Sequence, residues 1–318
     1  MTTATSVVDV NQSFSVRRDM AWMLAGTGLR GLSQWGILFL LVKLTNPEVV
    51  GQYGLALTLA LPVMIFSTLS LTRLQGSDAI RTYTFGDYSG LRVSSTVVAV
   101  IAVAVIVAVS NPETPVLILT LAVACQLGLQ GLLEIFHGLF LQHGRLDSLG
   151  HGMIWSSLAI FIAVASALLL GFDISSAIVL STLALSIPLV FHYIPATRSI
   201  VDGRPDLNNT MRPRWRMAQF GLFRMALPLG ISLLVISLST TMPRYFLVAE
   251  EGQFQLGVLV ALLSLLGAGT LFSEALVQTA LPRLTKLYAA GDGSGLNTAL
   301  RRLIAGAFGL GLVVVLTA

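Results

Sequence analysis

The chain has 318 residues, of which 55% are hydrophobic and only 11% are charged, and its mean hydropathy is +0.83. Soluble domains carry about 25% charged residues, so this composition excludes a water-soluble enzyme and indicates a polytopic membrane protein. The formal net charge of +4 is modest, and its distribution along the chain carries more information than its sum.

Apolar runs long enough to cross a bilayer follow one another along the chain. A transmembrane helix needs about 20 such residues, and each run is too long for a strand. The sequence therefore predicts an all-α polytopic membrane protein with about nine transmembrane helices. The expected spans are 20–44, 50–72, 93–110, 115–141, 153–171, 174–196, 225–248, 253–281 and 303–318.

Basic residues gather in the N-terminal tail and in every second connection between these spans. All 19 lysines and arginines fall there except Arg30, Lys43 and Arg244, whereas the intervening connections hold mainly acidic residues such as Glu113 and Glu250. By the positive-inside rule, this asymmetry predicts a multi-pass protein of the cytoplasmic membrane with its N-terminus in the cytoplasm.

Arg30 lies near the middle of the first expected span, where a charge costs about 2.5–3.5 kcal/mol on insertion scales. Thr27, Ser33 and Gln34 lie at helical spacing from it and form a polar stripe on an otherwise apolar helix. Two roles are open for Arg30. In the first, it lines a transport cavity and binds a phosphate through two parallel hydrogen bonds. In the second, it forms an internal ion pair with an acidic residue of another span.

The fourth expected span carries a second polar group. Glu134 has Gln126, Gln130 and His137 at compatible helical spacing, and it is a candidate either for pairing with Arg30 or for proton coupling. Near the outer end of the seventh span, Arg244 is a candidate for a rim contact to lipid phosphate or for an interface anchor. The predicted cavity residues are Arg30, Thr27, Gln34, Glu134 and Arg244.

Two segments of the chain resemble each other. Gly51-Gln52-Tyr53 is similar to Gly252-Gln253-Phe254, and the same spacing carries Lys43 onto Arg244. This similarity predicts a parallel repeat of two helix bundles. The expected domains are a six-helix N-terminal lobe (1–200), a basic cytoplasmic or interfacial connection (201–224) and a partial C-terminal lobe (225–318). Because the second lobe would hold only three spans, we expect the chain to be truncated.

Enzyme chemistry is not expected. The sequence contains no glycine-rich phosphate loop, no Ser–His–Asp constellation and no zinc-ligand spacing, so we expect neither a cofactor nor a metal, and no nucleic-acid partner. Cys125 is the single cysteine, which excludes an internal disulfide.

The N-terminal third carries a family pattern. Trp22 to Gly26, the corner Asn46-Pro-Glu48 with Gly51-Gln-Tyr-Gly54, and Phe85-Gly-Asp-Tyr88 followed by Leu91-Arg92 resemble polysaccharide biosynthesis and O-antigen flippases. These belong to the multidrug/oligosaccharidyl-lipid/polysaccharide (MOP) exporter superfamily. The resemblance implies two six-helix lobes around a cavity that opens alternately to each side, and transport of an undecaprenyl-diphosphate-linked glycan. The implied partners are the lipid-linked glycan, membrane lipids and other polysaccharide-assembly proteins.

Three other functions are open at this stage. A small-molecule or drug exporter of the same superfamily generally relies on an intramembrane carboxylate near the start of its cavity, and the first span here carries Arg30 instead. A membrane-embedded glycan polymerase or ligase usually has a substantial external loop, and the expected outer connections are short. The third possibility is that the protein is a truncated, inactive remnant of such a transporter.

Overall fold

The structure is a computed structural model. It describes the backbone of residues 5–78, 83–110, 114–202, 218–289, 295, 297–301 and 304, and the side chains of 18–19, 21–78, 83–110, 114–200, 219–263, 295, 297–301 and 304. Within these ranges the chain forms helices and turns and contains no strand. The prediction of an all-α fold is confirmed.

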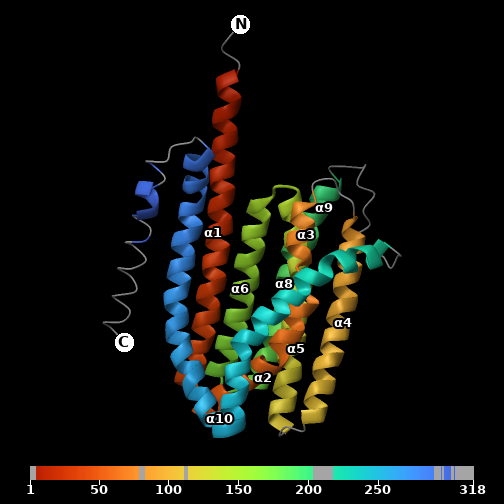
Figure 1. Ribbon diagram of the computed structural model, residues 1–318, viewed down its shortest axis with the longest axis vertical. Helices are drawn as coiled ribbons and strands as arrows, with labels where there is room; N and C mark the ends of the chain where they lie inside the picture. Colours follow the sequence, from red (N-terminus) through yellow and green to blue (C-terminus); the bar gives the residue numbers. More distant parts are fainter. Residues whose placement is uncertain are drawn as a thin grey trace.

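Figure 1 shows the long helices side by side, with the N-terminal end of α1 projecting beyond the others. The elements in chain order are α1 (Thr5–Leu44), α2 (Pro47–Ser67), α3 (Leu71–Ser77), α4 (Phe85–Ser110), α5 (Thr114–Gln142), α6 (Leu146–Leu169), α7 (Ile174–Ala184), α8 (Ser186–Pro188), the π-helical turn η1 (Leu189–Tyr193), α9 (Ile194–Asp202) and α10 (Ala218–Ala289).

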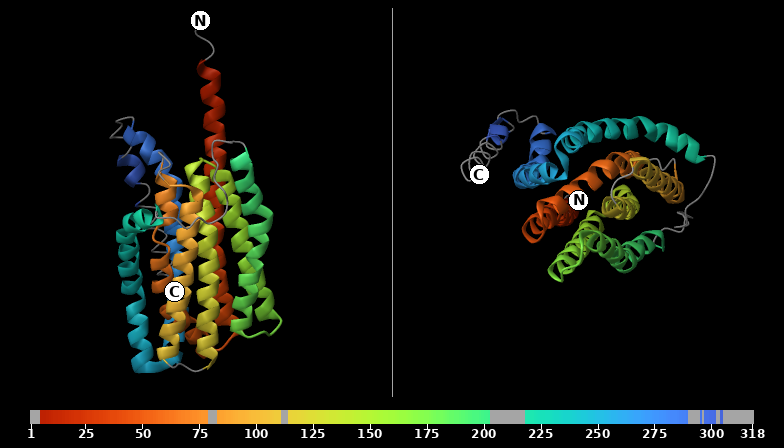
Figure 2. Two further views of the ribbon diagram at one scale, coloured as in Figure 1. Left: turned by 90° about the vertical axis from the view of Figure 1, so that its right-hand side faces the viewer. Right: turned by 90° about the horizontal axis from the view of Figure 1, so that it is seen from below.

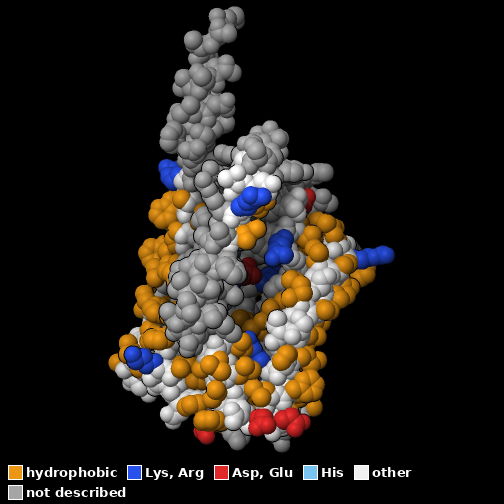
Figure 3. Space-filling view, turned by 60° about the vertical axis from the view of Figure 1, so that its left-hand side comes forward, with side chains coloured by type: hydrophobic (Ala, Val, Ile, Leu, Met, Phe, Trp, Pro, Cys, Tyr) orange, Lys and Arg blue, Asp and Glu red, His pale blue; other side chains and the backbone are white. Residues whose placement is uncertain are grey.

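The outer surface of the helices is apolar. Val98, Ile101, Val105 and Val109 form a helical stripe along α4, and each side chain is exposed; Figure 3 shows hydrophobic side chains over much of the described face. Such an extended apolar surface fits lipid and not water. The chain is therefore a multi-pass membrane protein.

Six segments of the described chain are long and apolar enough to cross a membrane. They are Pro47–Ser77, Phe85–Ser110, Thr114–Gln142, Leu146–Leu169, Ile174–Ile200 and Gln219–Leu263. The expected count of about nine is therefore not confirmed. The first helix, α1, is not among the six, and its apolar run is interrupted by Arg30 and Gln34. The expected span 303–318 lies outside the described residues, apart from Ile304.

Several helix boundaries differ from the sequence prediction. The helix expected at 93–110 begins at Phe85 because Thr84 and Asp87 cap it reciprocally: the Asp87 carboxylate accepts from the Thr84 amide at 3.0 Å, and the Thr84 hydroxyl accepts from the Asp87 amide at 3.3 Å. The span expected at 50–72 is interrupted between α2 and α3, where Leu69 and Ser70 have left-handed backbone angles (φ 48° and 53°).

At the turn between α6 and α7, Asp173 caps the N-terminus of α7. The Asp173 carboxylate accepts from the Ser176 amide at 3.1 Å and from the Ser176 hydroxyl at 2.6 Å. The hydrogen bond from the Ser176 side chain lowers the pKa of Asp173 below its ordinary value.

Both spans expected at 225–248 and 253–281 lie within α10, which is broken at Gly252 (φ 83°, ψ −176°). Figure 1 shows the chain reverse direction there and return beside α1, and the end-on view in Figure 2 shows α10 along one side of the other helices. The turns after α1, between α6 and α7 and at Gly252 share one end of the molecule.

The two segments whose sequences resemble each other pack closely together. A Cβ atom on Gly51 would lie 2.0 Å from the carbonyl oxygen of Gln253, and one on Gly257 would lie 2.0 Å from that of Pro47. Small residues allow this close backbone approach between membrane helices. Leu256 and Val260 of α10 complete the main apolar core of the N-terminal helices. The repeat and its domain boundaries stay predictions.

Candidate functional site

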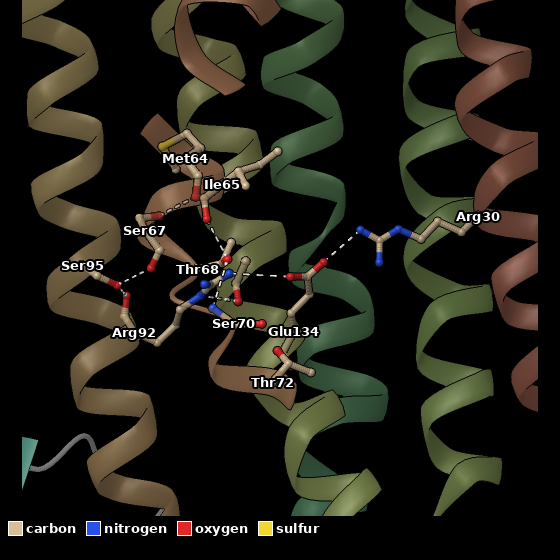
Figure 4. A network of polar contacts seen from close by, with 11 residues as sticks. Arg30, Met64, Ile65, Ser67, Thr68, Ser70, Thr72, Arg92, Ser95 and Glu134 are labelled. Carbon is tan, nitrogen blue, oxygen red and sulfur yellow. Dashed lines mark hydrogen bonds and ion pairs between the residues drawn. The ribbon is translucent and has the colours of Figure 1, made fainter. Parts of the chain in front are cut away.

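The charged residues of the first and fourth expected spans meet in the structure. Arg30 on α1 donates from Nη2 to Glu134 Oε1 on α5 at 2.9 Å, and their side chains are 37% and 28% exposed. Figure 4 shows the Arg30 side chain extending across the space between the helices toward Glu134. The ion pair left open by the sequence is therefore present, and it leaves the Arg30 guanidinium accessible from one side.

A second guanidinium approaches Glu134 from α4. Arg92 Nη2 lies 3.7 Å from Glu134 Oε2, and its Nε donates to the Gly131 carbonyl oxygen at 2.8 Å. Its side chain is only 3% exposed. A Cβ atom at Gly131 would lie 2.2 Å from Arg92 Nη2, so the missing side chain of this glycine makes room for the guanidinium.

Sequence reasoning missed Arg92 as a site residue, because it placed this arginine in a cytoplasmic connection. The signal that locates it is the capping pair Thr84 and Asp87, which starts α4 early enough to carry Arg92 into the bundle.

The pair borders a cavity of about 290 Å³ between α1, α2, α5, α6, α7 and η1. Its wall is apolar for the most part. The polar residues that line it are Arg30, Ser33, Gln34, Tyr53, Gln126, Gln130, Glu134, His137, Ser156, Ser157 and Tyr193.

One helical turn from Glu134 on α5, His137 belongs to a second polar cluster that lines the same cavity. His137 Nε2 and the Tyr193 hydroxyl are 2.8 Å apart, and Ser156 Oγ lies 3.2 Å from that hydroxyl. Tyr193 is fully buried and closes the π-helical turn η1, which follows Pro188. Such turns are frequent at functional sites. Sequence reasoning identified His137 but missed Tyr193 and the turn that presents it.

The five predicted cavity residues have different positions. Arg30, Gln34 and Glu134 line the cavity, as do Gln126, Gln130 and His137. Thr27 and Arg244 are not among the lining residues. The Thr27 hydroxyl donates to the Met23 carbonyl within α1 at 2.9 Å. Arg244 is half-buried on α10, and its Nε has no hydrogen-bond partner among the described residues.

The charges around Glu134 do not balance. Two guanidinium groups, which stay charged at all relevant pH values, face one carboxylate, so the described residues of this part of the site carry an excess of one positive charge. In the low dielectric of a protein interior an excess charge attracts an oppositely charged group strongly. The described residues contain no cluster of three or more histidine, cysteine or acidic side chains that would hold a metal ion. The arrangement suits an anionic ligand.

Comparisons with known proteins agree with this picture. CapF, a capsular polysaccharide biosynthesis protein of Staphylococcus aureus, is 26% identical over 275 residues, and the alignment spans 85% of this chain and 66% of that relative. A crystal structure of MATE in the straight conformation aligns with a TM-score of 0.55 at 16% identity and covers 95% of this chain and 71% of its own. An outward-facing multidrug resistance MATE transporter of the MOP superfamily gives a TM-score of 0.52 at 14% identity, over 95% and 70% of the two chains. These similarities show a shared fold.

The family model described as "Polysaccharide biosynthesis protein" matches residues 16–288, which is most of the chain. The resemblance drawn from the N-terminal motifs is thereby confirmed. This chain belongs to the polysaccharide biosynthesis protein family.

Proposed function

We propose that this protein is a membrane transporter that carries a lipid-linked oligosaccharide on an undecaprenyl diphosphate anchor across the cytoplasmic membrane by alternating access. The glycan would serve polysaccharide or O-antigen assembly. The observation that carries the proposal is the excess positive charge beside the cavity, where Arg30 is the accessible guanidinium. Membership of the polysaccharide biosynthesis family supports the same substrate class.

The chemistry of the Arg30 side chain fits a diphosphate. A guanidinium presents parallel N–H donors that match two phosphate oxygens, and it keeps its charge without water. The largely apolar wall of the cavity lowers the local dielectric constant and so strengthens the attraction. We further propose that the N-terminus is cytoplasmic. Most lysines and arginines lie in the N-terminal tail and in connections that alternate along the chain with the turns after α1, between α6 and α7 and at Gly252, and these three turns share one end of the molecule.

A drug exporter is the second candidate. It is supported by the fold shared with a multidrug resistance MATE transporter and by the presence of a carboxylate, Glu134, in the cavity. Against it, Glu134 is paired with two guanidiniums, so the site has no surplus negative charge for a cationic drug.

The test is Arg30→Ala, introduced into the chromosomal gene of a strain that makes the polysaccharide. We expect loss of at least about 90% of exported glycan with the protein still in the membrane, because about 1.4 kcal/mol of lost binding is already a tenfold effect. Arg30→Lys should restore export only in part, since an ammonium makes no bidentate contact.

Lys43→Ala on the same helix is the matched control, because Lys43 is an exposed cation outside the cavity lining, and it should leave export unchanged. Normal export by a well-expressed Arg30→Ala variant contradicts the proposal. Loss of resistance to cationic dyes in Glu134→Gln, with export intact, favours the drug exporter instead.

A further inference from the structure

The two guanidiniums that flank Glu134 differ in freedom. Arg92 is 3% exposed, its Nε is bound to the Gly131 carbonyl, and a methyl group at Gly131 would already collide with it. Arg30 is 37% exposed at the cavity, and one hydrogen bond, from Nη2, joins it to Glu134. Arg92 is therefore a fixed partner of the carboxylate, whereas Arg30 is a partner that can be released.

The backbone of Glu134 is held independently of its side chain. The Thr72 hydroxyl on α3 donates to the Glu134 carbonyl oxygen at 3.0 Å, and Figure 4 shows Thr72 close to Glu134. A change in the pairing of the carboxylate therefore needs only a rotation of its side chain, from Oε1 on Arg30 toward Arg92.

We propose that Glu134 is a displaceable counter-ion: a phosphate group entering the cavity replaces the Glu134 carboxylate on Arg30, and Arg92 retains the released carboxylate. This inference rests on the proposed function and deepens it, because it gives Arg92 a positioning role without contact to the cargo. Each of the three charged side chains has an oppositely charged partner both before and after the exchange. Before it, Glu134 is shared by two cations; after it, Arg30 pairs with phosphate and Arg92 with Glu134.

Arg92 matters because an uncompensated charge in a protein interior is strongly unfavourable. Without Arg92, Glu134 has Arg30 as its sole ion-pair partner among the described residues, and a phosphate would have to leave the carboxylate unpaired. Loss of Arg92 should therefore weaken phosphate binding even though its guanidinium is buried away from the cavity. If the Glu134 carboxylate is also removed, phosphate binding should no longer depend on Arg92.

The experiment is a double-mutant cycle on the full chain in lipid nanodiscs. Binding of farnesyl diphosphate is measured by calorimetry for the unmodified protein, Arg92→Met, Glu134→Gln and the double variant, with Arg30→Ala as the control for the site. Inorganic pyrophosphate is measured in parallel, so that a contribution of the lipid chain is separated from that of the diphosphate alone.

We expect Arg92→Met to weaken binding about tenfold or more, Glu134→Gln to tighten it by about threefold or more, and the double variant to bind within about threefold of Glu134→Gln. Rescue by the second substitution distinguishes a positioning role from a structural one, because a merely damaged fold is not repaired by a change at Glu134. Arg92→Lys, which keeps the charge, should bind close to the unmodified protein.

A double variant as weak as Arg92→Met overturns the inference, since Arg92 would then contact the anion itself. If Arg92→Met does not fold, Glu134→Gln decides alone: unchanged or weaker binding overturns the exchange. Absence of diphosphate binding by the unmodified protein, or binding that survives Arg30→Ala, contradicts the proposed function and the inference with it.

Discussion

Tyr193 shows how a single residue joins two parts of the site. Its hydroxyl lies within hydrogen-bond distance of His137 on α5 and of Ser156 on α6, and its ring stacks on Phe140 with the planes 5° apart. A buried polar group that loses its partner costs more than the net value of the bond. We therefore expect the Tyr193 hydroxyl to contribute more to the free energy of unfolding than the hydroxyl of an exposed tyrosine does.

We predict that Tyr193→Phe lowers the free energy of unfolding by about 1–3 kcal/mol, because it leaves the buried His137 nitrogen without this partner. Thermal unfolding in detergent measures the change. Tyr245→Phe is the control: Tyr245 is 51% exposed, so its loss should alter stability by less than about 0.5 kcal/mol. Equal shifts for the two variants would refute a structural role of the Tyr193 hydroxyl.

At this scale, the sequence identified the residues whose charge conflicts with their surroundings. Arg30 and Glu134 interrupt apolar runs, and that conflict alone marks them as site residues. Arg92 sits at the edge of such a run, where a cation is ordinary, and Tyr193 has the same amphipathic character as any tyrosine near a membrane surface. Their roles depend on the start of α4 and on the turn η1, which hydropathy does not reveal.

Among the elements, the two halves of α10 are joined by a backbone conformation that glycine alone adopts readily. Gly252 has φ 83° and ψ −176°, and a Cβ atom there would meet no other atom within 4 Å. A substitution at this position is therefore strained by backbone geometry and not by crowding. The contact of α10 with α2 depends on this reversal, since Gln253 follows it directly and touches Gly51.

We predict that Gly252→Ala destabilises the protein by about 1–3 kcal/mol, the usual cost of a side chain in a sparsely populated backbone region. Gly28→Ala on α1 is the matched control, because a Cβ atom there also meets open space and the backbone is helical; it should stabilise by about 0.5–1 kcal/mol. Thermal unfolding of both variants is the measurement. A neutral Gly252→Ala would show that the reversal tolerates other backbone angles.

Element types were easier to predict than their interruptions. Long apolar runs indicated helices for α2, α4 to α7 and α10, because only helices and closed barrels satisfy backbone groups in lipid. Leu69 and Ser70 between α2 and α3 have left-handed backbone angles, but neither is a glycine or a proline, so the sequence does not indicate a break there. Tertiary contacts accompany it instead, such as the bond from the Ser95 hydroxyl to the Ser67 carbonyl oxygen at 2.8 Å.

For the whole molecule, the orientation in the membrane is the property that the charge asymmetry predicts most directly. Asp173 and Arg145 are both exposed, and they lie at opposite ends of α6, whose 24 residues span about 36 Å at 1.5 Å per residue. They are therefore suitable reporters for the two sides of the bilayer. Cys125 is exposed and has to be replaced by serine first.

We predict that Asp173→Cys reacts with a membrane-impermeant maleimide in intact cells, whereas Arg145→Cys reacts only after permeabilisation, because basic connections stay in the cytoplasm. Mass tagging on a gel measures both reactions. The reverse pattern would place the N-terminus outside and invert the proposed direction of transport.

The size of the chamber beside Arg30 has a consequence for selectivity. At about 290 Å³ it lies just below the range for ligand pockets, about 300–1,000 Å³, which suits a diphosphate group better than a chain of several sugars. Under the proposed function, the protein recognises the diphosphate link that lipid-linked cargoes share, and the attached sugars lie outside this cavity.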